Sequence, residues 1–143
     1  MSTLHLKIIT PQKIALEEDI SSVTVPSAEG EITILPHHAN LFALLMEGII
    51  KIKPSFAEGK EEYLAIGGGY LETDGEEINI LVSRAYGQGE IDEVQTQRAI
   101  EDAQKIIFEA KDEEARKEAI SHLRRSVIDM KLLKRRKHVQ SPV

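Results

Sequence analysis

The chain has 143 residues, no cysteine, and a formal net charge of −6 from 18 basic and 24 acidic side chains. The lack of cysteine excludes a disulfide scaffold and any thiolate zinc site, and the acidic balance argues against nucleic-acid binding. No apolar run approaches the ~20 residues that span a bilayer, and no signal peptide is visible. We therefore expect a soluble cytoplasmic protein.

The first 86 residues follow the two-residue period of β-strands. Apolar and polar side chains alternate over residues 4–9, and residues 17–19, which are all acidic, are expected to form a turn before a strand at 21–25. The apolar run 41–46 is expected to be a buried strand. Asp74-Gly75 predicts a type I′ hairpin, because that turn needs positive φ at both central residues. Further strands are expected near residues 31–34, 49–53, 61–66, 70–73 and 78–82. About eight or nine short strands at this spacing indicate a β-sandwich or flattened barrel.

The period changes from 2 to 3.6 after residues 86–90, and no glycine follows Gly89. Asp92 or a neighbour can cap a helix there. One apolar stripe runs from Ala99 to Ala110 and another from Ala119 to Met130. A single helix would extend ~70 Å at ~1.5 Å per residue, whereas a hairpin that turns near residues 111–113 buries both stripes.

We therefore predict an all-β sandwich at 1–86, a linker at 87–91, an α-helical hairpin at 92–137 and a flexible tail at 138–143. Nothing local forbids the straight form of the helical part, so this element can be bistable. The charge also divides along the chain. Residues 1–86 carry 6 basic and 13 acidic side chains, residues 87–114 carry 3 and 9, and residues 115–143 carry 9 and 2. An acidic front and a basic tail predict two surfaces with different partners.

Two turns between residues 25 and 41 hold the first site candidates. Glu29 and Glu31 flank Gly30 and have the residue types of a general acid–base pair, but no apolar pocket is evident to separate their pKa values. A solvated turn is favoured. His37 and His38 stand in the second turn; adjacent side chains diverge and no third ligand has a matching spacing, so no metal site is predicted.

Two other segments invite a binding interpretation. The run Gly67-Gly68-Gly69 has the glycines of a phosphate-binding loop but no nearby lysine, and a strand follows it instead of a helix. A strand bulge or the close approach of another backbone is favoured.

The basic tail shares its helix faces with Glu118 and Asp129 and has no interleaved aromatics. A solvated helix face that pairs partly with the acidic first helix is favoured over binding to nucleic acid or lipid.

Three blocks of sequence precede the helical part in a distinctive order. The first is residues 23–41, with a Glu-Gly-Glu turn, a short strand and Pro36-His37-His38-Ala39. The second is residues 65–72, and the third is residues 78–82. In this order they resemble the epsilon subunit of the bacterial F-type ATP synthase, from Leu6 to about Lys134. The family usually has glycine at the position of His37, where positive φ costs glycine less than histidine.

The resemblance implies a non-catalytic rotor subunit that couples proton flow to ATP synthesis and restrains ATP hydrolysis through its C-terminal helices. It implies that Glu29, Gly30 and Glu31 contact the ring of c subunits, and that His38, Gly68 and Gly69 contact the gamma subunit. In the extended tail, a set of cations would meet the alpha and beta subunits: Arg116, Arg124, Arg125, Lys131, Lys134 and Arg135. The chain would lie on the cytoplasmic face of the bacterial inner or plasma membrane, peripheral to it.

Some members of the family bind ATP in the folded helix pair, which gives an alternative function as an ATP-sensing regulatory subunit. Their motif is Ile/Leu-Asp-x-x-Arg-Ala, of which this chain keeps Ile91 and Asp92 but has Gln95-Thr96 in place of Arg-Ala. In the second helix, Arg124 matches one expected arginine and Ile120 stands at the other. Charge-assisted hydrogen bonds are the strong ones, so the loss of two cations weakens a polyphosphate site. We expect no cofactor, and no nucleophile–base constellation suggests an enzyme.

Overall fold

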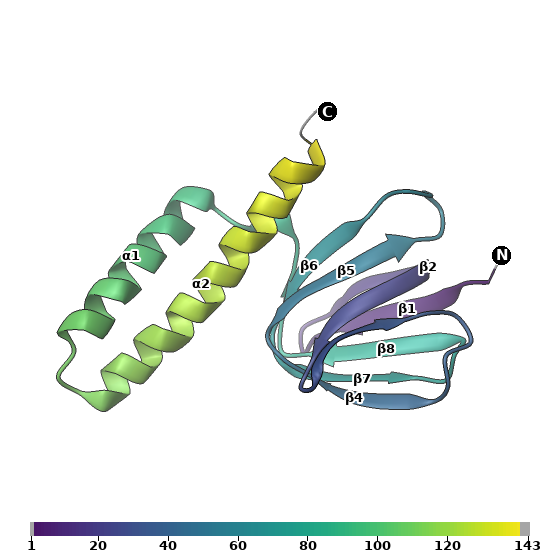
Figure 1. The fold of residues 1–143 in the computed structure, drawn as a ribbon, viewed down its shortest axis with the longest axis horizontal. Helices are drawn as coiled ribbons and strands as arrows, with labels where there is room; N and C mark the ends of the chain where they lie inside the picture. The colour runs from purple at the N-terminus through teal and green to yellow at the C-terminus, as the bar shows by residue number, and fades with distance from the viewer. Residues whose placement is uncertain (1, 141–143) are drawn as a thin grey trace. The chain divides into compact units, whose positions relative to one another are not determined.

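The structure is a computed structural model that describes residues 2–140, with side chains described up to residue 135. The chain divides into two compact units, the first ending at Tyr86 and the second beginning at Gly87. The first unit is built from β-strands and the second from helices (Figure 1). This confirms the predicted fold class of a β-sandwich followed by an α-helical hairpin.

The strands of the first unit form one continuous sheet that folds over on itself (Figure 1). Their bounds are β1 (Leu4–Ile9), β2 (Ile14–Ser27), β3 (Gly30–Ile34), β4 (Leu41–Leu45), β5 (Gly48–Pro54), β6 (Glu62–Ile66), β7 (Gly69–Thr73), β8 (Glu77–Val82) and β9 (Ala85–Tyr86). The order is β1-β8-β7-β4-β2-β5-β6-β9, with β3 paired to β2. The first half of β2 pairs with β1 and its second half with β3 and β5, so this strand belongs to both layers.

Alternation along the strands builds the core, because successive side chains point to opposite faces. Leu4, Leu6 and Ile8 of β1 are fully buried, while the residues between them are partly exposed. The facing strands supply mostly β-branched and aliphatic side chains to the same core: Ile20, Val23, Val25, Ile34, Ile50, Ile52, Ile66, Leu71, Ile78, Ile80 and Val82. Burial of these side chains is the main favourable contribution to the stability of the sandwich.

Two local predictions were wrong. Residues 17–19 are not a turn but lie inside the long strand β2, because β1 offers a partner strand that places His5 and Lys7 opposite the acidic side chains. The hairpin at Asp74-Gly75 is present, but only Gly75 has positive φ, so the turn is not type I′. Asp74 Oδ1 instead accepts hydrogen bonds from the backbone N–H groups of Glu76 and Glu77, which holds a longer loop and lowers the Asp74 pKa.

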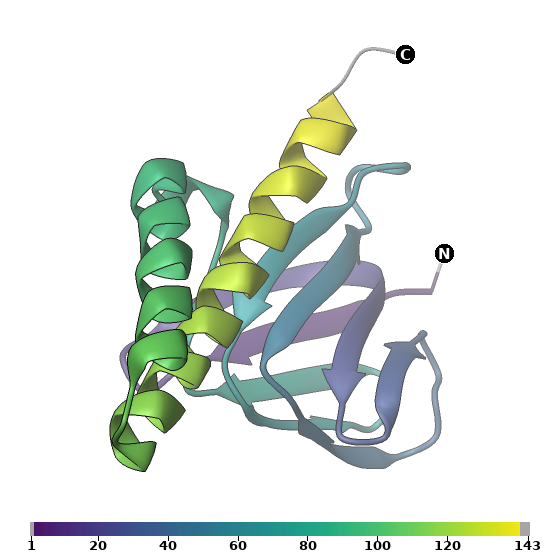
Figure 2. The same cartoon turned by 60° about the vertical axis from the view of Figure 1, so that its left-hand side comes forward.

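The second unit contains η1 (Gln88–Glu90), α1 (Glu93–Glu109) and α2 (Glu113–Gln140). The two helices lie side by side as a hairpin (Figure 2), rather than as one long helix. Asp92 caps α1 by accepting a hydrogen bond from the Gln95 N–H at 2.9 Å. Ala103 and Ala119 are buried, as their stripes predict. No helix among residues 2–140 is both long and apolar enough to cross a bilayer.

The end of α2 differs from the predicted boundary. The helix continues to Gln140, so residues 138–140, assigned to the flexible tail from the sequence, have helical backbone. The remaining residues of that tail, 141–143, lie outside the described part of the chain.

Candidate functional site

The Glu-Gly-Glu turn is the tip of the β2–β3 hairpin. Gly30 takes a φ of +117°, and the Ser27 hydroxyl donates a hydrogen bond to the Gly30 carbonyl. The Glu29 N–H donates in turn to Ser27 Oγ at 3.2 Å. Glu29 and Glu31 are both exposed. Two exposed carboxylates lack the contrasting environments that an acid–base pair needs, so this turn does not have the arrangement of an acid–base site.

The second turn carries the adjacent histidines. His37 takes a φ of +68°, and it is the one non-glycine residue with positive φ among residues 2–140. Its N–H donates to the Gly75 carbonyl at 2.8 Å, and its Nε2 lies 3.1 Å from Ser2 Oγ. His38 is half-buried and its Nδ1–H donates to the Ala39 carbonyl at 2.7 Å. No cluster of potential metal ligands occurs in the described residues.

A groove of about 600 Å³ connects the two turns. Ala28 and Glu29 line it from the first turn, and His38 lines it from the second. The rest of its wall comes from Ser27 at the end of β2 and from β3 and β4, with Ile32, Thr33, Ile34, Leu41, Phe42, Ala43 and Leu44. The structure therefore brings the predicted c-ring loop and the predicted gamma-contact histidine to the lining of one mainly apolar groove.

The sequence interpretation missed the exposed apolar face of β4. The run 41–46 was expected to be buried, yet the exposed fractions are 61% for Phe42, 60% for Leu44 and 55% for Met46. Phe42 stacks on Tyr70 of β7 with ring centroids 5.2 Å apart. These four residues, called the β4 patch below, lie on the neighbouring strands β4 and β7 or, in the case of Met46, directly after β4. An apolar run has the same appearance in sequence whether its neighbours cover it or a partner does, so only the fold reveals the patch.

Two of the three consecutive glycines, Gly67 and Gly69, serve the chain's own packing. A Cβ on Gly69 would lie 1.9 Å from the Leu81 carbonyl oxygen of β8, and one on Gly67 would lie 2.1 Å from Ser83 Oγ. The favoured interpretation, a close approach of another backbone, therefore holds for Gly69, and the approaching strand belongs to the same chain. Gly68 is exposed, and a Cβ there has ordinary space beside the Leu45 carbonyl.

The helical unit presents its predicted cations to solvent. Every residue of the predicted set is exposed: Arg116, Arg124, Arg125, Lys131, Lys134 and Arg135. Asp92 of the degenerate ATP motif and the nearby Gln88 both hold the start of the helical unit. Asp92 serves as the cap of α1, and Gln88 Nε2 donates to the Leu132 carbonyl at 3.0 Å. The start of the helical unit thus lies beside Leu132, about two helical turns from Arg124.

Comparisons with known proteins agree with this architecture. Residues 3–88 match the family described as ATP synthase, Delta/Epsilon chain, beta-sandwich domain. The ATP synthase epsilon chain of Nitratiruptor sp. is 36% identical over 115 residues, covering 80% of this chain and 88% of the relative. That of Wolinella succinogenes is 38% identical over 112 residues, covering 78% and 84%.

Solved structures show the same fold at low sequence identity. A chain of the Euglena gracilis mitochondrial ATP synthase OSCP/F1/c-ring structure matches with a TM-score of 0.70 and 20% identity, covering 99% of this chain and 83% of that one. A chain of the Tetrahymena thermophila mitochondrial ATP synthase central stalk and c-ring matches with a TM-score of 0.59 and 17% identity, covering 91% and 96%. Because more than a third of the aligned residues are shared with epsilon chains over most of both lengths, this protein belongs to the ATP synthase epsilon chain family.

Proposed function

We propose that this chain is a non-catalytic rotor subunit of a proton-translocating F-type ATP synthase. In this role it couples proton flow through the membrane ring to ATP synthesis, and its C-terminal helices restrain ATP hydrolysis. Its place in the epsilon chain family supports the proposal, since the relatives carry the name of a subunit of that enzyme. We place it on the cytoplasmic face of the bacterial inner or plasma membrane, held there through the complex.

The observation that carries the proposal is the β4 patch beside the groove. A contiguous apolar patch that is left to water in the free chain marks a surface for a partner. We propose that the gamma subunit covers this patch. His38 lines the groove next to it, and we propose that the exposed Gly68 and the neighbouring Gly69, which pairs with Leu45 at the end of β4, belong to the same gamma contact.

The two remaining surfaces are assigned to other subunits. The exposed Glu29-Gly30-Glu31 turn offers carboxylates to polar loops of the c ring. The exposed cations of α2 complement acidic segments of alpha and beta when the helices extend. Both assignments follow the charge of the surface, because complementary charge steers and orients association.

A pair of matched substitutions tests the gamma contact. Leu44→Asp places a charge in the β4 patch, and the control Phe56→Asp changes another exposed apolar residue, 71% exposed, in the loop after β5. We expect Leu44→Asp to weaken co-purification with gamma at least about tenfold, because a buried unpaired charge is costly at an interface. Phe56→Asp should assemble normally. Thermal melts of both isolated variants check folding, and full assembly of a folded Leu44→Asp chain would contradict the proposal.

A further inference from the structure

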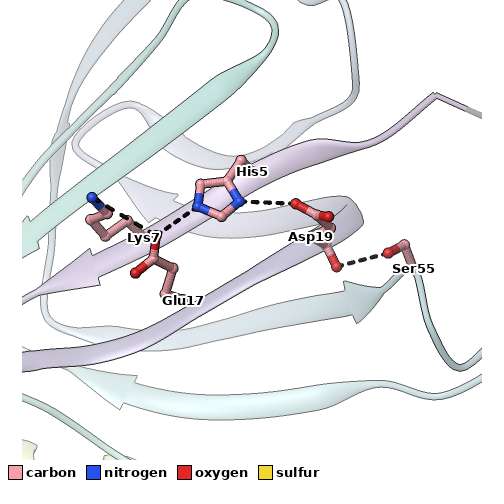
Figure 3. Close-up of polar contacts among 5 residues, drawn as sticks. All are labelled: His5, Lys7, Glu17, Asp19 and Ser55. Atoms are coloured by element: carbon pink, nitrogen blue, oxygen red, sulfur yellow. Dashed lines mark hydrogen bonds and ion pairs between the residues drawn. The ribbon is translucent and has the colours of Figure 1, made fainter.

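The acidic residues at positions 17–19 of β2 bond to different partners on the two faces of the sheet. Glu17 and Asp19 lie on the outer face, where the His5 ring stands between them (Figure 3). His5 Nε2 lies 2.7 Å from Glu17 Oε2, and His5 Nδ1 lies 2.9 Å from Asp19 Oδ1. Lys7 Nζ lies 3.9 Å from the same Glu17 oxygen. Both ring nitrogens are donors only in the protonated imidazolium, so the two bonds together require a proton on His5.

Glu18 faces the opposite way, toward the interior. In the β1–β2 register it lies opposite Leu6, which is fully buried, and in the β5–β6 register Glu62 lies opposite Ile52, which is also fully buried. The two glutamates therefore occupy inward-facing positions on different strands. Glu18 Oε1 is buried without a hydrogen-bond partner among the described residues.

The contact between these two glutamates also requires a proton. Glu62 lies close enough to Glu18 for their side chains to share a proton, and two ionised carboxylates have no donor between them. Burial, followed by the hydrogen bond and the charge of Glu62, raises the pKa of Glu18 to about 7. A proton bound by Glu18 would therefore join β2 to β6 on the inner side.

The surroundings contain few competing charges. On β8, Glu77 is the register neighbour of His5, and Asn79 is that of Lys7. Just before β6, the carboxylate of Glu61 accepts a hydrogen bond from the hydroxyl of Tyr63 on that strand. On β5, the residues that face the interior near Glu18 are apolar: Ile52 and Pro54. The loop after β5 is tied to the same segment, because Ser55 Oγ donates to the Asp19 carbonyl at 3.0 Å (Figure 3).

We propose that residues 17–19 are a proton-binding element that fastens β1 and β6 to β2 more firmly as the pH falls from about 8.5 to about 6. Protonation of His5 joins β1 to both outer carboxylates, and protonation of the inner pair joins β6 to β2. The two faces respond in the same direction, since each contact gains a donor when a proton binds. The element belongs to the sandwich itself and does not depend on the role of the chain in an assembly.

The direction follows from linkage between proton binding and folding. The pKa of His5 is raised by its bonds to Asp19 and Glu17, and that of Glu18 is raised by burial. A group whose pKa is raised in the folded state stabilises the fold fully at pH values below its unfolded-state pKa. This stabilisation is lost as the pH rises through the folded-state pKa. The stabilisation from Glu18 is therefore lost between about pH 4.5 and about pH 7, and the stabilisation from His5 is lost as the pH rises above 6.5. Glu17 has a lowered pKa because of His5, so the outer contact also weakens in acid.

The test measures unfolding of the whole 143-residue chain between pH 6 and pH 8.5. Glu18→Gln removes the inner proton site, His5→Asn removes the outer one, and a double variant removes both. Glu58→Gln, at an exposed loop position, is the matched control. The folding constant of the unsubstituted chain should fall with pH by up to about tenfold per unit for each proton released. Each single variant should reduce that slope, and the double variant should abolish it.

Two outcomes overturn the proposal. The first is a double variant whose folding constant changes with pH as steeply as that of the Glu58→Gln control.

The second outcome is measured on the unsubstituted chain, where a carbon-13 NMR titration follows the Glu18 carboxyl directly. A midpoint near 7 supports the shared proton, and a midpoint below 5 contradicts it. This second measurement decides the question even when a variant does not fold, and Glu62→Gln offers a further substitution at the same contact.

Discussion

His37 and Gly75 face each other across two turns, and both hold left-handed backbone, with φ of +68° and +92°. The His37 N–H donates to the Gly75 carbonyl at 2.8 Å. A Cβ on Gly75 would lie 2.7 Å from the His38 carbonyl oxygen, so that position has no space for a side chain. The groove-lining turn of His38 is thereby anchored to the β7–β8 loop, although a histidine occupies the strained position next to it.

Replacement of His37 by glycine should stabilise the sandwich. Glycine takes positive φ without the Cβ clash that costs other residues roughly 1–2 kcal/mol, and the exposed contact with Ser2 that is lost contributes less. We expect a gain of about 0.5–1 kcal/mol in the free energy of unfolding, measured by urea denaturation. His38→Gly is the control, because His38 does not have positive φ and its replacement should destabilise the chain. Equal loss in both variants would contradict the strain at His37.

Replacement of Gly69 by alanine should have the opposite effect. The added Cβ would lie 1.9 Å from the Leu81 carbonyl oxygen and 2.8 Å from Val82 Cα, so β7 and β8 must separate. We expect a loss of about 3 kcal/mol or more, at the upper end of overpacking costs. Gly89→Ala is the matched control, since nothing lies within 4 Å of a Cβ there. A melting temperature for Gly69→Ala equal to that of the control would show that the close approach is not required.

A disulfide crosslink tests the assignment of the Glu-Gly-Glu turn. The chain has no cysteine, so Glu31→Cys introduces a single thiol at the exposed tip, to be paired with a cysteine in the polar loop of the c subunit. We expect a crosslinked product in the assembled complex, because this turn is proposed to meet that loop. Glu58→Cys, in another exposed loop, should give none. Similar yields from the two positions, or no product from position 31, would count against the assignment.

Removal of residues 88–143 tests the regulatory role of the helices. The sandwich carries the proposed docking surfaces, so assembly should persist. ATP hydrolysis by the complex should rise about fivefold or more, the lower end of an allosteric coupling of 1–3 kcal/mol. Neutralising Arg124 and Arg125 to glutamine should reproduce part of this rise, whereas neutralising Lys105 and Lys111, which lie outside α2, should not. Unchanged hydrolysis after truncation would argue against an inhibitory tail.

Nucleotide binding to the isolated chain should be weak or absent. The position of the motif's arginine holds Gln95, and Asp92 is engaged as the cap of α1, so few charged donors remain for a polyphosphate. We expect no calorimetric signal at ATP concentrations below ~1 mM. Gln95→Arg restores one cation and should strengthen any residual binding, with Gln97→Arg as a control on the same helix. A micromolar Kd for the unsubstituted chain would instead support the ATP-sensing alternative.

Much of this molecule is determined locally. Alternating side chains specify the strands, because only one face of each can be buried, and the change of period after residue 86 specifies the helices. The Asp92 cap follows from one side chain and the N–H groups beside it, so it was predictable as well. The positive φ at Gly75 was also predictable, because glycine has no Cβ. The turn type was not predictable, because the Asp74 carboxylate closes a longer loop.

Other features depend on strands that are distant in sequence. Residues 17–19 have the composition of a turn, and only pairing with β1 makes them a strand, because His5 and Lys7 supply opposite charge. The β4 patch is exposed because no strand among residues 2–140 covers Phe42 and Leu44. The sequence by itself thus determined which segments are strands or helices and which residues can turn. The tertiary structure decided which faces are buried and which carboxylates meet a proton donor, since burial and charge pairing arise between segments that sequence order does not bring together.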